Sequence, residues 1–157
     1  TLVVPWVMGE LYPRDRGFYA EQFARKGITL QCSRYARDIV DAPPSQHPLV
    51  LLHLEMATGP DPRDAGLRDI IDRSGSMDRF GLSTRVLLHT LQQLRAPSSP
   101  NAQTPILVTG LCDADTCFLH DSLEKQLTEA GATGYVDLTR VPYRQLIETV
   151  QEHLPRR

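Results

Sequence analysis

The chain has little of several features that would mark a specialised class of protein. Among its 157 residues are three cysteines, an odd and small number that disfavours a disulfide framework and favours a reducing, cytoplasmic environment. The formal net charge is −2, so no basic field is present to attract nucleic acid or an anionic membrane. No apolar run has the length of a membrane span, and no stretch resembles a signal peptide. These absences indicate a globular domain in water.

Motifs of common enzymes and of repeat proteins are absent as well. The chain has no glycine-rich phosphate loop, no nucleophile elbow, no internal repeat and no low-complexity tract. Its length suits one well-cored domain, residues 1–157, and is short for two. Because the sequence begins with Thr1 rather than methionine, we expect it to be part of a longer protein.

The densest group of potential metal ligands lies between residues 112 and 120. It consists of Cys112, Asp113, Asp115, Cys117 and His120. Zinc sites of the finger type combine two close pairs of ligands, and only one loose pair is present here. We therefore interpret this stretch as a loop in which Asp115 caps the next helix, and we predict neither a metal nor a cofactor.

The most informative stretch that is present runs from Pro48 to Met56. The five residues from Pro48 to Leu52 are apolar without alternation, which is typical of a strand buried on both faces at the centre of a parallel sheet. The run ends in the polar residues His53 and Glu55. In open parallel sheets, ligands and chemistry collect at the carboxyl ends of the strands, so His53 occupies the position that matters most for function.

Strand and helix signals alternate along the rest of the chain. Five strand-like stretches are separated by amphipathic, helix-like ones, which predicts an α/β sandwich with a parallel sheet and helices on both faces. The strands are expected at 2–7, 28–32, 48–56, 105–109 and 134–136. The regular spacing fails at residues 57–81, where glycine, proline and charge predict an insertion outside the core, flexible apart from a short helix around Leu67 that Asp64 caps.

Three stretches resemble response-regulator receiver (CheY-like) domains. Leu49 to Met56 is similar to their "LVLLDLxMP" strand, 105–110 to their fourth strand, and Ala130 to Val136 to their "AGAxGYV" segment. The resemblance implies a three-layer, flavodoxin/CheY-like doubly wound fold with five parallel strands in the order 2-1-3-4-5 and an insertion after the third strand. It also implies that Trp6, His53 and Thr109 converge at one edge of the sheet.

The residues that carry phosphorylation in receivers are replaced in this chain. The phosphate-accepting aspartate falls on His53, and the paired acids that hold magnesium after the first strand fall on Pro5 and Trp6. The lysine after the fifth strand falls on Leu138, and the proline behind it on Thr139. Proline, indole and imidazole supply no hard oxygen ligand for magnesium. The chain thus resembles a degenerate receiver, or pseudo-receiver, without catalytic residues.

Two receiver features persist. The switch pair of hydroxyl and aromatic side chains falls on Thr109 and Tyr135. The surface that receivers often use for a dimer or an output partner would include charged residues of the last two helices. These are Lys125, Glu129, Arg144 and Glu148.

These observations predict a phosphorylation-independent, receiver-like signalling domain that acts through a protein partner or a homodimer, without contacting nucleic acid or membrane. The alternative is a small α/β enzyme or ligand-binding domain whose crevice is lined by Trp6, His53, Glu55 and Thr109. Imidazole is itself a competent nucleophile, so a phosphate-accepting His53 is a further alternative. We prefer a His53 satisfied by neighbouring hydrogen bonds.

Overall fold

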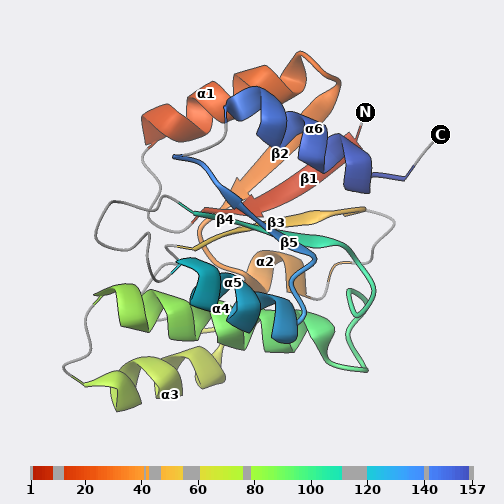
Figure 1. Cartoon of the computed structure of the whole chain (residues 1–157). Coiled ribbons are helices and arrows are strands. Elements are labelled where there is room, and N and C mark those ends of the chain that lie inside the picture. Colours follow the sequence, from red (N-terminus) through yellow and green to blue (C-terminus); the bar gives the residue numbers. More distant parts are fainter. Residues whose placement is uncertain are drawn as a thin grey trace.

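Three layers make up the fold: a central sheet with helices on either side (Figure 1). This computed structural model describes residues 2–8, 13–40, 42, 47–54, 61–75, 79–110, 120–139 and 142–155. Within those residues, no helix is long and apolar enough to cross a lipid bilayer.

The sheet has five strands in the order β2-β1-β3-β4-β5, and every pairing between neighbours is parallel. The strands are β1 (Leu2–Val7), β2 (Ile28–Ser33), β3 (Val50–His53), β4 (Ile106–Gly110) and β5 (Gly134–Asp137). The predicted fold and strand order are therefore confirmed. The central strands β3 and β4 are buried along their whole length, which explains why their sequences are continuously apolar rather than alternating.

The helices divide between the two faces of the sheet. Figure 1 shows α1 and α6 above the sheet, α2, α4 and α5 below it, and α3 outside α4. Their bounds are α1 (Pro13–Ala24), α2 (Arg37–Val40), α3 (Ala65–Ser74), α4 (Arg79–Arg95), α5 (His120–Glu129) and α6 (Tyr143–His153). This division is what right-handed crossovers between parallel strands require.

Each face of the sheet has its own hydrophobic core. Alternate residues of a strand point to opposite faces, so Leu51 and Leu107 pack toward α1 and α6, whereas Leu52 and Val108 pack toward α4 and α5. Trp6 is completely buried in the core beneath α1 and α6. That core positions the functional side chains described below.

The predicted insertion is better packed than its composition indicates. Asp64 caps α3, accepting a hydrogen bond from the Leu67 backbone N–H at 3.0 Å, which confirms the predicted cap. Leu67, however, is 5% exposed and belongs to the core cluster that includes Val86 and Leu87 of α4. The prediction that residues 57–81 lie outside the core is wrong here, because α3 buries its apolar stripe against α4. Its last residues are also helical, since α4 begins at Arg79.

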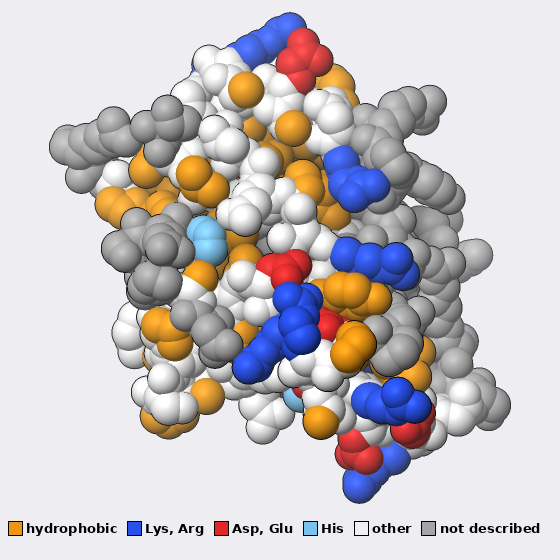
Figure 2. All heavy atoms as spheres, turned by 180° about the vertical axis from the view of Figure 1, so that it is seen from behind, with side chains coloured by type: hydrophobic (Ala, Val, Ile, Leu, Met, Phe, Trp, Pro, Cys, Tyr) orange, Lys and Arg blue, Asp and Glu red, His pale blue; other side chains and the backbone are white. Residues whose placement is uncertain are grey.

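Ion pairs tie the start of this segment to α2. The guanidinium of Arg63 donates to Asp38 at 2.6 Å and to both carboxylate oxygens of the buried Asp61 at 3.0 Å. These hydrogen bonds lower the pKa of Asp61. On the face seen in Figure 2, basic and acidic side chains likewise lie in mixed groups rather than in a field of one sign. This mixture agrees with the near-neutral charge of the chain.

Candidate functional site

Three predicted site residues meet where β3 and β4 end. His53 is the last residue of β3 and lies beside Thr109 of β4 in the strand register. Trp6 comes from β1, on the other side of β3. All three side chains are completely buried. The predicted convergence of Trp6, His53 and Thr109 is therefore confirmed.

The hydroxyl of Thr109 joins the other two side chains. Trp6 Nε1 donates a hydrogen bond to Thr109 Oγ1 at 3.2 Å, and His53 Nδ1 lies 3.1 Å from the same oxygen. An indole N–H can only donate, so Thr109 accepts from Trp6 and has its own proton to give to His53 Nδ1. The result is a buried chain of hydrogen bonds, Trp6 to Thr109 to His53, which we call the Trp–Thr–His chain.

Burial also determines the charge of the imidazole. It lowers the pKa of His53 from 6.5 to about 4, because a protonated ring would lose its hydration. The ring is therefore neutral near pH 7, and with Nδ1 accepting, its proton is assigned to Nε2. Among the described residues, Nε2 has no hydrogen-bond partner. His53 is thus only half satisfied by the neighbours that the structure describes.

The strand register refines the comparison with the paired acids of receivers. Pro5 and Trp6 lie inside β1 rather than after it, and Trp6 is level with Leu51. The next pair, Val7 with Leu52, brings Met8 to the level of His53. Met8 is buried and ends the described part of this segment. Placing the paired acids directly after the apolar run that ends at Val7, rather than at Pro5, would have identified Met8 from the sequence as the residue level with His53.

The end of β5 is held by its backbone and by a carboxylate. The Leu138 N–H donates to the carbonyl of Gly110 at 2.8 Å, and its side chain packs against the core beneath α1 and α6. Asp137 Oδ1 accepts from both the N–H and the hydroxyl of Thr139, at 2.9 and 2.6 Å. The sequence patterns did not single out Asp137, a buried acid at the same sheet edge as His53. Its position directly after the apolar residues of the fifth strand was the sequence signal that could have identified it.

The second member of the predicted switch pair fills a space that only glycine leaves open. Tyr135 of β5 lies beside Val108, and its hydroxyl is buried against Gly110. A Cβ atom at residue 110 would overlap the Tyr135 hydroxyl and would lie 2.9 Å from Cζ. Gly110, directly after Thr109, therefore allows Tyr135 to occupy this inward position.

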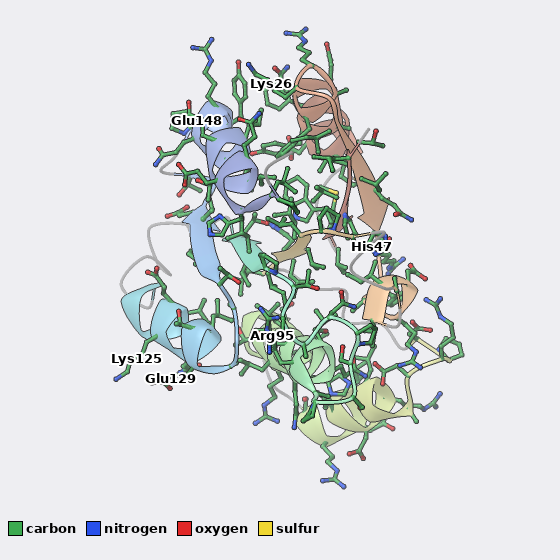
Figure 3. All side chains as sticks on the ribbon, turned by 90° about the vertical axis from the view of Figure 1, so that its right-hand side faces the viewer. Lys26, His47, Arg95, Lys125, Glu129 and Glu148 are labelled. Carbon is green, nitrogen blue, oxygen red and sulfur yellow. The ribbon has the colours of Figure 1, made fainter. Side chains whose placement is uncertain are left out.

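The four residues of the predicted partner surface lie on two helices that flank the edge strand β5. Figure 3 shows Lys125 and Glu129 on α5, below the sheet, and Glu148 on α6, above it. Arg144 is on the exposed side of α6, with its guanidinium 5.8 Å from the centre of the Tyr143 ring. We call these two helices with β5 the α5–β5–α6 face.

Some predicted residues lie outside the described part of the chain. They are Glu55, Cys112, Asp113, Asp115 and Cys117, together with the side chain of His120. Among the residues that the structure does describe, no group of three or more histidine, cysteine, aspartate or glutamate side chains is placed to hold a metal ion.

No protein-family model matches the chain, and no curated protein does. Solved structures, in contrast, match over nearly its whole length. The receiver domain of a Francisella response regulator has a TM-score of 0.61 at 12% identity, covering 98% of this chain and 96% of its own. A response regulator from Burkholderia multivorans has a TM-score of 0.56 at 20% identity, with 99% and 98% covered. The chain has the receiver fold.

Another match is the receiver domain of a sensor histidine kinase from Pseudomonas aeruginosa, solved with magnesium in its active-site cleft. Its TM-score is 0.59 at 11% identity, with 96% of this chain and 95% of that chain covered. At the corresponding edge here, the one buried carboxylate among the described residues is that of Asp137, whose Oδ1 accepts from Thr139, and the described side chains around His53 offer magnesium no carboxylate. The only hydroxyl oxygen of the Trp–Thr–His chain already accepts from Trp6, and a neutral imidazole and the Met8 thioether are not hard oxygen ligands.

Proposed function

We propose that this chain is a receiver-like signalling module that acts through protein contacts and is not switched by aspartyl phosphorylation. The receiver fold supports a signalling role, and the Trp–Thr–His chain supports independence from phosphate. Trp6, Thr109 and His53 fill the space at the strand ends and hydrogen-bond to one another there. A phosphoryl group at His53 would have to break these hydrogen bonds.

The chemistry of phosphoryl transfer favours the same proposal. A receiver needs a carboxylate nucleophile, a magnesium site rich in oxygen and a cation for the phosphoryl oxygens. Here His53 occupies the acceptor position and Leu138 the position of the cation. His53 Nδ1 is engaged by Thr109, and Nε2 is buried, so neither nitrogen of the ring is presented to a phosphodonor in solution. For the same reason we propose no enzymatic activity.

The output would be a contact rather than a product. We propose a protein partner or a weak homodimer at the α5–β5–α6 face, where Lys125, Glu129, Arg144 and Glu148 would form ion pairs around the rim of the contact. Such mixed charges select orientation and partner more than they add affinity. We expect this module to work in the cytoplasm.

The test is incubation with magnesium and a small phosphodonor such as acetyl phosphate, followed by intact mass measurement and amide NMR spectra. We expect no gain of mass and no shift of the β3 and β4 amides. A stable gain of one phosphoryl group that is lost in His53→Ala would make His53 a phosphate acceptor and refute the proposal. A gain that persists in His53→Ala would refute it too, by placing the acceptor on another residue.

One observation favours the ligand-binding alternative. The buried Nε2 of His53 has no partner among the described residues, and a strongly lowered histidine pKa is frequent at functional sites. If a small ligand supplies that partner, the ¹⁵N chemical shift of His53 Nε2 would change when the ligand is added. Screening a set of small hydrogen-bond acceptors, such as carboxylates and amides, by this signal tests the alternative directly.

A further inference from the structure

We infer that a groove between α1 and α6 is a docking site for an acidic, amphipathic helix of a partner protein. The groove has a volume of about 370 Å³. Its lining includes Gln22, Arg25 and Lys26 at the end of α1 and Tyr143, Arg144 and Ile147 of α6. This surface shares Arg144 and Glu148 with the α5–β5–α6 face but extends from α6 to α1 instead of to β5 and α5. The inference rests on the proposed function only in taking protein contact as the output.

The shape of the groove suits a helix. Both helices run from the carboxyl edge of the sheet to its opposite edge, because each follows a strand of the parallel sheet. The lining residues recur at helical spacing on both walls, at Gln22 and Arg25 on one and at Arg144, Ile147 and Gln151 on the other. A partner helix that lies along this groove would present an apolar row at the same spacing to Tyr143 and Ile147.

The charge of the groove selects the partner. Three cations line it, Arg25, Lys26 and Arg144, against one carboxylate, Glu148. The chain as a whole has the opposite sign, with a net charge of −2. Arg25 pairs with Glu21 at 3.0 Å on the exposed surface, whereas no described carboxylate lies within ion-pair distance of Lys26 or Arg144. Lys26 is thus available to acidic side chains that flank an apolar row, and Arg144, which lies over the Tyr143 ring, has no described carboxylate partner.

Aromatic contacts join the two helices that form the walls of the groove. Phe18 of α1 packs edge-to-face against Tyr143 of α6, with ring centres 5.2 Å apart, and also against Tyr19 at 5.6 Å. Tyr19 in turn packs edge-to-face on the buried Trp6 at 5.2 Å. Phe18 is the one large hydrophobic side chain among the described residues that is exposed, at 44%. These rings fix the spacing of the two helices, so binding would require little rearrangement.

The probe for this site is a fluorescently labelled helical peptide of about 18 residues, with leucines at i, i+4 and i+7 and glutamates beside them. A matched peptide carries lysine at every glutamate position. We expect the acidic peptide to bind roughly tenfold tighter than the basic one, with amide shifts in α1 and α6, and to weaken as salt is raised. Equal affinity for the two peptides would refute the inference, as would shifts confined to other elements.

Charge reversals locate the contact. Lys26→Glu and Arg144→Glu should each weaken the binding of the acidic peptide by roughly two- to fivefold, the change expected for the loss of an exposed ion pair. Lys125→Glu, the same change on the opposite side of the sheet (Figure 3), should alter the affinity by less than about twofold. Equal effects of Lys26→Glu and Lys125→Glu would exclude the groove.

A second copy of this chain is the competing occupant. Self-association that shifts the same α1 and α6 amides as the concentration rises would replace the partner helix with a homodimer and overturn the inference. The peptide titrations and the phosphodonor experiment test the two proposals independently of each other. A gain of mass there leaves the peptide titrations unchanged, and a failed titration leaves the phosphodonor result unchanged.

Discussion

Removing one hydroxyl tests the Trp–Thr–His chain most directly. Thr109→Val keeps the shape of a β-branched side chain but removes the oxygen shared by Trp6 and His53. Both buried groups then lack that hydrogen bond, and each such loss costs about 1–3 kcal/mol. We expect the free energy of unfolding to fall by about 2–4 kcal/mol. For a domain of this size, the melting temperature would fall by roughly 5–15 °C.

The measurement is urea denaturation followed by circular dichroism. Tryptophan fluorescence is unsuitable as the signal, because Trp6 is the only tryptophan and one of the variants removes it. The double-mutant cycle adds Trp6→Phe to wild type and to Thr109→Val. The indole N–H loses its acceptor once Thr109 is replaced, so Trp6→Phe should be less costly in the Thr109→Val background, by about 1 kcal/mol. Strictly additive effects would mean that the indole and the hydroxyl do not interact.

Thr90 of α4 provides a matched control. It is also a buried threonine, at 2% exposed, but its hydroxyl donates only to the Val86 carbonyl at 2.9 Å. That carbonyl lies within the helix, so Thr90→Val should cost less than about 1 kcal/mol. If Thr109→Val is no more destabilising than Thr90→Val, the Trp–Thr–His chain does not contribute to the stability of the fold.

Two further predictions concern His53 and Gly110. The unfolded chain binds a proton on His53 near pH 6.5 and the folded chain only near pH 4, so stability should fall between those values by up to about 3 kcal/mol as the pH is lowered. His53→Asn, compared with wild type in urea titrations across that range, should flatten this part of the profile. Gly110→Ala should displace the buried hydroxyl of Tyr135, because the added Cβ would overlap it. We expect amide shifts along β5 and a loss of about 1–3 kcal/mol.

Each of these predictions has its own control. Burial also lowers the pKa of His47, so its contribution to the pH profile has the same sign, and an unchanged profile in His53→Asn would assign the dependence to other groups. A methyl group added at Gly17, in the helix α1, would meet no atom of a neighbouring segment within 4 Å, so Gly17→Ala should gain about 0.5–1 kcal/mol. If Gly110→Ala is equally harmless, Tyr135 does not require the space at residue 110.

The sequence by itself determined the architecture, because the relevant signals are local. The continuous apolar run before His53 identified a strand buried on both faces, and Asp64 marked the start of a helix that the structure contains. Alternation of strands with amphipathic helices leaves few arrangements once crossovers must be right-handed. The resemblance to receivers supplied the strand order and brought His53, Thr109 and Trp6 to one edge.

The tertiary structure alone decided how these parts contact one another. Trp6 and Thr109 are 103 residues apart, and their hydrogen bond depends on the register of three strands. The burial of Leu67 depends on a surface of α4 that composition does not reveal, which is why the insertion was expected outside the core. The groove between α1 and α6 exists because both helices cover one face of the sheet. Local patterns specify elements, whereas register and packing between distant residues specify a site.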